Sequence, residues 1–300
     1  MKFDFIMLLK GKNIVITGSG RGIGKSIALA CASEGANVGL MSRTEDELNQ
    51  TSTEINDMGL NVKVAIKNAD VTNFEEVSKA FEHFNIELGQ LNGVIANAGA
   101  SRMGKTHEFD NDRFVNIINV NIIGVFYTFK AAYPYFKLDD KSDKARFITT
   151  GSAAYTNPMP QFAAYTATKY AMIGFQESIA LEYKKENINF NQILPTMVDT
   201  RLLRGRKAGD GNKPDNVMSP RELNDYYLFL LSENSNRMNN EIIFTNYIQE
   251  AIRLMKEAPP EKSSSWDDFK GHLETVSPKV YQNVRKLGKL IDFIIERGNI

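Results

Sequence analysis

The feature that most constrains the fold is a regular alternation of short apolar runs and longer amphipathic stretches over the first 200 residues. Near-continuous apolar strands are typical of a parallel sheet that helices cover on both faces, and right-handed crossovers connect such strands. The sequence therefore predicts an α/β fold with a doubly wound parallel sheet of the Rossmann type. The expected strands are 13–17, 36–41, 62–66, 91–96, 146–150, 188–194 and 241–245, and the expected helices are 23–34, 45–58, 73–87, 110–136, 162–185 and 219–232.

The character of the chain changes after residue 200. Residues 201–217 are rich in Gly, Lys, Arg, Asn and Asp and have little periodicity, so we expect a mobile loop that covers the substrate. The sequence Ser-Pro-Arg-Glu at 219–222 predicts a capped helix start. Residues 246–300 have a helical pattern but too few apolar residues for an independent core. We expect a single domain, 1–245, with a helical C-terminal extension, 246–300, packed on that domain or on a partner subunit.

The charge balance excludes some classes of function. Thirty-six Lys and Arg residues balance thirty-six Asp and Glu residues, whereas nucleic-acid binders and polybasic membrane binders need an excess of cations. We therefore expect no nucleic-acid partner, no membrane association and no metal site. The single cysteine, Cys31, excludes an intrachain disulfide and favours packing in the core of a cytoplasmic protein. The apolar residues 1–9 are too short for a membrane span and lack a signal-peptide cleavage site, and we expect no other run to approach membrane-spanning length. Met7 can be the natural start.

A glycine-rich turn joins the first predicted strand to the first predicted helix. Glycines permit close backbone approach, and a helix N-terminus presents unpaired N–H groups to an anion, so the turn predicts a dinucleotide pyrophosphate site. An ordinary strand–helix turn is the alternative. The spacing of Gly24-Lys25-Ser26 does not fit a Walker phosphate loop. The predicted cofactor residues of the turn are Gly18, Ser19, Arg21, Gly22, Ile23 and Gly24.

The pattern Thr-Gly-x-x-x-Gly-Ile-Gly at 17–24 resembles the cofactor motif of classical short-chain dehydrogenases/reductases. The resemblance extends over about residues 11–245, with several motifs in the family's order. It implies a Rossmann fold, a nicotinamide cofactor and a small carbonyl or alcohol substrate. It also implies that Asp70 holds the adenine and that Val71 adds a backbone contact. A helix N-cap is the alternative role for Asp70.

Two further segments resemble family motifs that lie near the cofactor. Residues 97–99 match an Asn-Ala-Gly motif, although Ala96 stands where the family often has Asn. Residues 195–200 resemble Pro-Gly-x-Val-x-Thr near the nicotinamide, with the β-branched Thr196 in place of the glycine. The residues that the resemblance places at the cofactor are Asn97, Ala98, Gly99, Pro195, Val198 and Thr200.

The end of the second predicted strand favours NADP(H) over NAD(H). Ser42 stands where NAD-binding proteins usually carry an acid, and Arg43 follows it. A carboxylate would repel a 2′-phosphate, whereas a guanidinium pairs with it bidentately. Arg21 in the glycine turn can supply a second cation. The alternative is that Arg43 only solvates the helix that follows.

Tyr165 and Lys169 form the centre of a predicted catalytic site. Residues four apart share one face of a helix. A free tyrosine has a pKa near 10, and a neighbouring cation lowers it, so Lys169 would make Tyr165 a usable general acid/base. The same spacing also arises by chance on solvated helix faces.

Two more residues complete the predicted catalytic set. Ser152 lies just beyond a strand end, thirteen residues before Tyr165, and can donate to a substrate carbonyl oxygen; it matches the family's catalytic serine. The resemblance implies that Asn121 is a fourth catalytic residue, that it holds a water relaying protons from Lys169, and that Lys169 binds the nicotinamide ribose. Alternatively, Asn121 is a structural residue with a polar partner inside an apolar helix.

These observations predict an NADP(H)-dependent alcohol dehydrogenase or carbonyl reductase. A 3-oxoacyl-carrier-protein reductase is one alternative, although compact members of that group end soon after the last strand and this chain continues over residues 246–300. A catalytically silent NADP(H) sensor or scaffold is the other, and the intact catalytic set argues against it. The resemblance implies a homodimer or homotetramer formed through the two long helices and the last strand. Cations that can attract an anionic substrate are Arg201, Arg204, Arg206 and Lys207.

Overall fold

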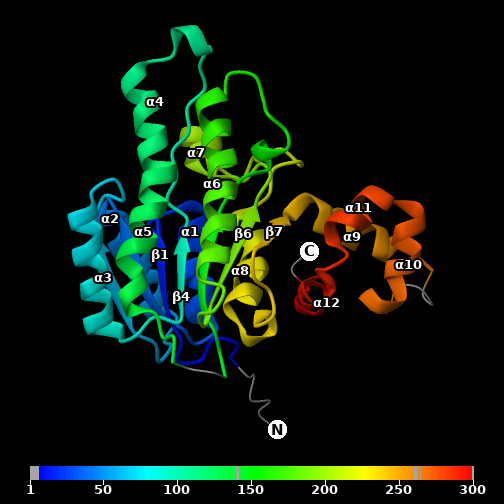
Figure 1. The fold of residues 1–300 in the computed structure, drawn as a ribbon, viewed down its shortest axis with the longest axis horizontal. Coiled ribbons are helices and arrows are strands. Elements are labelled where there is room, and N and C mark those ends of the chain that lie inside the picture. The colour runs from blue at the N-terminus through cyan, green and yellow to red at the C-terminus, as the bar shows by residue number, and fades with distance from the viewer. Residues whose placement is uncertain (1–6, 140–141, 260–262, 264, 299–300) are drawn as a thin grey trace.

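Seven parallel strands form the centre of the molecule in the order β3-β2-β1-β4-β5-β6-β7 (Figure 1), which confirms the predicted fold class. The computed structural model describes residues 7–139, 142–259, 263 and 265–298, so the predicted role of residues 1–6 lies outside the described chain. The order reverses between β1 and β4, and in such sheets ligands bind beyond the carboxyl ends of the strands at this reversal. The strands are β1 (Asn13–Thr17), β2 (Asn37–Ser42), β3 (Val64–Asn68), β4 (Gly93–Ala96), β5 (Ala145–Thr150), β6 (Ile188–Leu194) and β7 (Glu241–Phe244).

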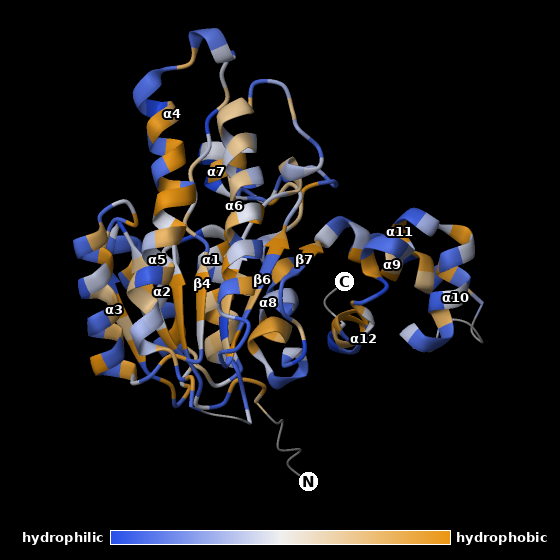
Figure 2. Ribbon diagram, viewed as in Figure 1, coloured by the Kyte–Doolittle hydropathy of each residue, from blue (hydrophilic) through white to orange (hydrophobic). Residues whose placement is uncertain are grey.

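Helices cover both faces of the sheet. Ile14 and Ile16 of β1 pack with α1, α2 and α8, whereas Val15, which points to the opposite face, packs with α3, α5 and α6. Figure 2 shows the apolar strands lying between these helix layers. Cys31 is fully buried in α1, as predicted, and burial raises its thiol pKa. The helices are α1 (Gly22–Ser33), α2 (Glu45–Asp57), α3 (Phe74–Leu88), α4 (Asn111–Ile118), α5 (Gly124–Ala132), α6 (Ala163–Glu182), α7 (Arg201–Arg204), α8 (Asn224–Leu231), α9 (Thr245–Glu257), α10 (Trp266–Val276), α11 (Pro278–Val284) and α12 (Gly288–Arg297).

The helix predicted over 110–136 is interrupted. A π-helical segment, Asn119–Ile123, joins α4 to α5, and a 3₁₀ turn, Tyr133–Tyr135, ends the run. A π-helical segment inserts a wider turn and often marks a functional position. Here it carries Asn121, whose side chain bonds both backbone polar groups of Ala100, at 2.8 and 2.9 Å.

Within the described residues, the run Asn111–Tyr135 is long and apolar enough to cross a bilayer by length and composition. The expectation that no run reaches that length is therefore wrong. The run has the arrangement of a core helix, because many of its apolar side chains are packed within the protein. Its buried apolar residues are Ile117, Val120, Val125, Phe129, Ala131 and Ala132.

The segment 201–217 is more ordered than its composition predicts. It begins with α7 and a 3₁₀ turn, Gly205–Lys207. Arg204 holds it together, since its guanidinium lies 2.9 Å from Asp199 and 3.1 Å from Asp210. The prediction of an irregular loop is thus wrong for its first seven residues, because ion pairs and short helical turns replace periodic apolar packing.

The predicted capped helix start before α8 is confirmed. The Ser219 hydroxyl accepts a hydrogen bond from the Arg221 N–H, and the Glu222 carboxylate accepts one from the Ser219 N–H at 2.7 Å. A 3₁₀ turn, Pro220–Leu223, comes first and leads directly into α8.

The C-terminal extension shares one hydrophobic core with the main domain. Its four helices, α9 to α12, contribute apolar side chains to the same buried cluster as α1 and α8. The extension packs on the main domain of the same chain: Phe293 lies 5.3 Å from the Phe229 ring of α8, and Arg297 lies 2.7 Å from Asp225 of α8. Its fully buried apolar residues are Ile248, Ala251, Phe269, Leu273, Val284, Leu290, Ile291 and Ile294.

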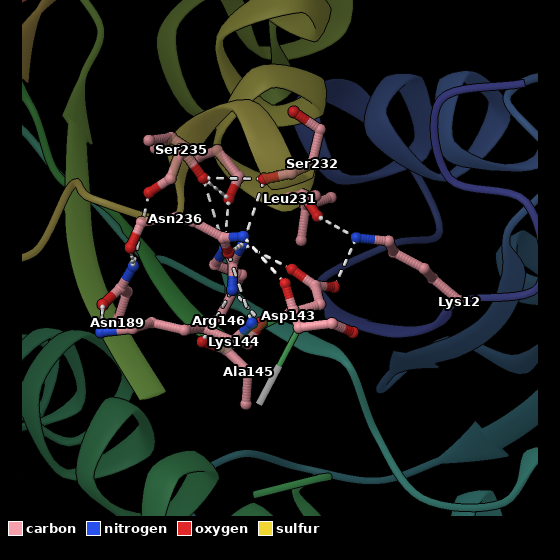
Figure 3. Close-up of polar contacts among 12 residues, drawn as sticks. Lys12, Asp143, Lys144, Ala145, Arg146, Asn189, Leu231, Ser232, Ser235 and Asn236 are labelled. Atoms are coloured by element: carbon pink, nitrogen blue, oxygen red, sulfur yellow. Dashed lines mark hydrogen bonds and ion pairs between the residues drawn. The ribbon is translucent and has the colours of Figure 1, made fainter. Parts of the chain in front are cut away.

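A buried polar cluster holds the C-terminal end of α8 against the sheet (Figure 3). The Arg146 guanidinium of β5 is fully buried and donates to Asp143 at 2.9 Å and to the Ser232 carbonyl at 3.1 Å. Lys12 donates to Asp143 at 2.6 Å and to the Leu231 carbonyl at 3.4 Å. Cations at a helix C-terminus satisfy its unpaired carbonyls, so this cluster fixes α8 relative to β1 and β5.

Candidate active site

The glycine turn forms a backbone cradle at the N-terminus of α1. Gly18 and Gly22 have left-handed φ angles of +68° and +57°. A Cβ on Gly24 would lie 2.3 Å from the Gly18 carbonyl oxygen, so no larger residue fits there without a backbone shift. Arg21 occupies the N-cap, and its side chain makes no capping hydrogen bond to the helix. The first N–H groups of α1 therefore fit an anionic ligand such as a pyrophosphate.

Asn97 and Ser19 fix the shape of this cradle. The Asn97 amide nitrogen, at the end of β4, donates to the Thr17 carbonyl at 3.0 Å. The Thr17 hydroxyl accepts from the N–H groups of Asn97 and Ala98, each at 3.0 Å. The Ser19 hydroxyl is buried and accepts from the Met41 N–H at 2.9 Å. The turn is thus bound to both β2 and β4, the strands that flank β1.

The two arginines predicted to bind a 2′-phosphate lie at one edge of the cradle, each beside a carboxylate. Arg21 lies 2.8 Å from Glu47 of α2, and Arg43 lies 3.6 Å from Asp70. Both guanidinium side chains are more than half exposed, so these ion pairs are weak and can be exchanged for a stronger anion. Ser42 lies beside the glycine turn, with its hydroxyl oxygen 3.2 Å from a Cβ built on Gly20, and this hydroxyl accepts from the Thr44 N–H at 3.3 Å.

Glu47 was missed by the sequence analysis. Its carboxylate also lies 3.0 Å from Arg201 of α7, so it connects the glycine turn to α7. Acidic residues are common in the first turn of a helix, and this pattern alone gives no signal of a partner at residue 201.

Asp70 does not cap a helix. Its carboxylate accepts from the N–H and hydroxyl of Thr72, each at 2.9 Å, whereas Asn73 is the N-cap of α3. The alternative role predicted for Asp70 is therefore wrong. Val71 is buried against Gly124, where a Cβ would lie 2.8 Å from the valine side chain.

Ser152, Tyr165 and Lys169 lie together beyond the carboxyl end of β5. The Ser152 side chain lies near enough to the Tyr165 phenol to lower its pKa, and the Lys169 ammonium lies 5.3 Å from the centre of the Tyr165 ring. Lys169 Nζ donates to the Thr150 carbonyl at 3.0 Å. One strand end and the first turns of α6 therefore place a hydroxyl, a phenol and an ammonium around one point.

Burial governs the electrostatics of this group. Burial lowers the pKa of Lys169 to about 8, because a desolvated ammonium favours its neutral form. Burial also raises the pKa of Tyr165, and the Ser152 side chain lowers it by less. The net direction for Tyr165 is thus opposite to the one expected from Lys169 alone.

Asn121 is fully paired within the protein. Besides its two bonds to Ala100, its amide nitrogen donates to the Thr168 hydroxyl at 3.0 Å. Thr168 precedes Lys169 on α6 and itself donates to the Tyr165 carbonyl at 2.7 Å. These contacts fit the structural alternative for Asn121, and they also place it beside α6. Gly99 lies next to Asn121, since a Cβ built on Gly99 would lie 3.6 Å from the Asn121 amide oxygen.

The segment 195–204 contacts both the glycine turn and the residue after Ser152. The Pro195 carbonyl accepts from the Ala153 N–H at 2.8 Å. Val198 is buried, and Thr200 lies 3.2 Å from a Cβ built on Gly22. Thr196, which replaces a family glycine, has a negative φ and carries no backbone strain.

No group of three or more His, Cys, Asp or Glu side chains is placed to hold a metal ion anywhere in the described ranges.

Comparison with known proteins agrees with this geometry. Residues 12–210 match the family described as short chain dehydrogenase. The chain belongs to the short-chain dehydrogenase family. It is therefore related to oxidoreductases that use a nicotinamide cofactor and act on small molecules.

Individual relatives show how far the likeness extends. The chain is 31% identical to (−)-trans-carveol dehydrogenase of Rhodococcus erythropolis over 209 residues, which is 65% of this chain and 74% of the relative. Two solved structures each cover 79% of this chain and 97% of their own, with a TM-score of 0.71. One is a 3-ketoacyl-(acyl-carrier-protein) reductase from Brucella melitensis complexed with NADH, 24% identical. The other is a short chain dehydrogenase from Burkholderia cenocepacia in complex with NADP, 23% identical.

Proposed function

We propose that this short-chain dehydrogenase is an NADP(H)-dependent alcohol dehydrogenase or carbonyl reductase in which Tyr165 is the general acid/base. The observation that carries the proposal is the convergence of Ser152, Tyr165 and Lys169 at the strand ends, next to the glycine cradle. The cradle fits a dinucleotide pyrophosphate because its backbone N–H groups are uncapped and only glycine is tolerated at Gly24.

The protein's own groups have distinct roles in this proposal. When bound, the nicotinamide donates the hydride in reduction or accepts it in oxidation. The Ser152 hydroxyl donates a hydrogen bond to the substrate oxygen. The Tyr165 phenol gives its proton to that oxygen during carbonyl reduction, or accepts the alcohol proton during oxidation. The protonated Lys169 favours the phenolate and binds the nicotinamide ribose, while Asn121 supports a proton relay beside α6.

The preference for NADP(H) rests on charge at the edge of the cradle. Ser42 stands at the end of β2, where an acid would repel a 2′-phosphate, and the exposed guanidinium groups of Arg21 and Arg43 lie at the same edge of the cradle. A 2′-phosphate carries more charge than one carboxylate, so it can displace Glu47 and Asp70 from the arginines. The solved structures include both an NADH and an NADP complex, so the charge argument carries this choice by itself.

We also propose a cytoplasmic homodimer. Exposed apolar side chains lie on α4, α5 and α6, namely Phe114, Val115, Phe126, Tyr170 and Leu181. The other predicted contact, through β7, lies beside the extension, since Ile242 and Phe244 line a cavity together with Gln282 and Leu287. A dimer through α4, α5 and α6 therefore fits better than a tetramer. Sedimentation equilibrium tests this; a monomer or a tetramer would contradict it.

Oxidation of NADPH in the presence of ketones, aldehydes and acyl thioesters tests the proposed activity, with NADH as the control cofactor. We expect turnover of at least one simple ketone or aldehyde and a higher kcat/KM with NADPH. Turnover of acyl thioesters alone would favour the 3-oxoacyl reductase. Tight NADPH binding without turnover of any compound would favour a sensor.

A further inference from the structure

A second tyrosine, outside the predicted catalytic set, contacts the floor of the site. Tyr227 lies on α8 and is fully buried. Its hydroxyl oxygen lies 2.8 Å from the hydroxyl oxygen of Thr150, the last residue of β5. The Thr150 hydroxyl also donates to the Asn97 amide oxygen at 3.2 Å. Three side chains from α8, β5 and the end of β4 thus form one hydrogen-bonded chain.

The number of available protons decides which group donates in each of these hydrogen bonds. The Asn97 amide nitrogen donates to the Thr17 carbonyl, which leaves the amide oxygen facing Thr150. An amide oxygen only accepts, so the single hydroxyl proton of Thr150 is used on Asn97. Tyr227 must therefore donate its own proton to the Thr150 oxygen. Burial raises the pKa of Tyr227, so the phenol retains that proton over the working pH range.

Both functional halves of the site depend on Thr150 and Asn97. Asn97 holds the glycine turn through the Thr17 carbonyl at 3.0 Å and the Gly18 carbonyl at 3.4 Å. The backbone carbonyl of Thr150 accepts from Lys169 Nζ at 3.0 Å. The chain of hydrogen bonds therefore ends at Asn97, which holds the glycine turn. Its middle residue, Thr150, also supplies the carbonyl oxygen that accepts from Lys169.

We propose that Tyr227 is a positioning residue, whose hydroxyl orients Thr150 and thereby holds Asn97 against the glycine turn and the Thr150 carbonyl beneath Lys169. The inference rests on the proposed function, since it assigns a role to Tyr227 at that same site. The rigid mounting of α8 supports it: Arg146 and Lys12 hold the carbonyls at its C-terminal end, and Arg297 holds Asp225 near its start.

The neighbouring tyrosine provides a matched control. Tyr226 lies on the same helix and is as fully buried as Tyr227. Among the residues that the structure describes, its hydroxyl finds no hydrogen-bond partner. Tyr226→Phe therefore removes the same atom from the same helix without touching the chain to Asn97.

The experiment compares Tyr227→Phe, Tyr226→Phe, Thr150→Val, Thr150→Ser and the double variant Tyr227→Phe/Thr150→Val. NADPH affinity is measured by fluorescence titration, kcat and KM on a carbonyl compound that the wild type reduces, and Tm by thermal unfolding. We expect Tyr227→Phe to weaken NADPH binding and lower kcat by about fivefold each, the effect of one buried hydrogen bond. Thr150→Val gives a loss at least as large, the double variant is no worse than Thr150→Val, and Thr150→Ser retains most of what Thr150→Val loses.

Three outcomes overturn the inference. The first is a Tyr227→Phe protein equal to Tyr226→Phe in NADPH affinity and kcat. The second is additive losses in the double variant, because independent effects mean that the two hydroxyls do not act as one chain. The third is a lower Tm with unchanged affinity and kcat, which means a merely structural role. If the wild type binds NADPH but turns over nothing, the proposed function fails while the affinities still decide the role of Tyr227.

Discussion

At the scale of single residues, burial decides in which direction the pKa values of Tyr165 and Lys169 move. The Tyr165–Lys169 spacing is readable in the sequence because it needs only the geometry of one helix. The direction of each pKa is not readable, because it depends on how β5 and the segment 195–204 remove water from α6. In the structure the phenol and the ammonium are both shifted toward their neutral forms. A bound dinucleotide adds negative charge nearby, which favours the protonated Lys169 that the proposed mechanism uses.

The buried ammonium makes stability depend on pH in a definite sense. The pKa of Lys169 is lowered from 10.5 to about 8 on folding, so below pH 8 both states are protonated and the full desolvation penalty is present. Between pH 8 and 10.5 the unfolded state binds more protons, and this contribution to stability improves as pH rises. Lys169→Met removes the penalty and should be more stable than wild type below pH 8, by up to about 3 kcal/mol, with the difference shrinking above pH 8.

Urea unfolding of the cofactor-free protein between pH 7 and 10 measures that difference. Lys184→Met, at an exposed position at the end of α6, is the control and should show no such trend. A constant difference between Lys169→Met and wild type across this range would contradict the account.

Cofactor preference is also a residue-scale property. Ser42→Asp places a carboxylate beside Arg43 and a 2′-phosphate, so the ratio of kcat/KM with NADPH to that with NADH should fall about ten- to a hundredfold, the effect of a charge-assisted contact. Glu47→Gln should instead raise the ratio, because it frees Arg21 from its ion pair. An unchanged ratio in both variants would remove the basis for the NADP(H) assignment.

At the scale of elements, local patterns predicted the strands, the glycine turn and the capped start of α8 because each depends on a few consecutive residues. The π-helical segment around Asn121 was not predicted, and the Asn121 side chain bonds Ala100, a residue 21 positions away that lies outside the helix. Tyr227 was missed because its partner Thr150 is 77 positions away. Only the packing of α8 on the sheet brings the two together.

The glycine cradle permits a direct test at the element scale. Gly24→Ala places a Cβ 2.3 Å from the Gly18 carbonyl oxygen, so the turn must move and NADPH affinity should fall by more than tenfold, with a stability loss of about 2 kcal/mol. Gly271→Ala, in the exposed middle of α10, meets nothing within 4 Å and should be stabilising by up to about 1 kcal/mol. Equal NADPH affinities for the two variants would contradict the assignment of the cradle.

At the scale of the whole molecule, the C-terminal extension packs against α8 through α12. Trp266 packs so closely on α12 that a Cβ on Gly288 would lie 2.1 Å from its ring. The sequence indicated helices in this region but not their shared core, because each short helix contributes only a few apolar residues. The core forms only when α9 to α12 meet one another and the main domain.

The Arg297 contacts connect the extension to the main domain and should matter for stability. Arg297 pairs with Asp225 and Glu34, each at 2.7 Å, and the Asp225 side chain is only 3% exposed. Arg297→Met should therefore destabilise the protein by about 1–3 kcal/mol, because a buried carboxylate loses a partner. Arg253→Met on α9 breaks two exposed ion pairs and should cost less than about 1 kcal/mol. Chemical unfolding of both variants compares them, and equal losses would contradict a docking role for Arg297.

The most direct test of the central claim is the turnover of Tyr165→Phe with NADPH and a carbonyl compound that the wild type reduces. The substitution removes one phenolic oxygen and leaves the glycine cradle unchanged, so the variant should bind NADPH with near wild-type affinity. We predict that its kcat falls by at least a thousandfold, in line with the loss of a proton donor. A variant that binds NADPH and retains a substantial share of wild-type kcat would contradict the assignment of Tyr165 as the general acid/base.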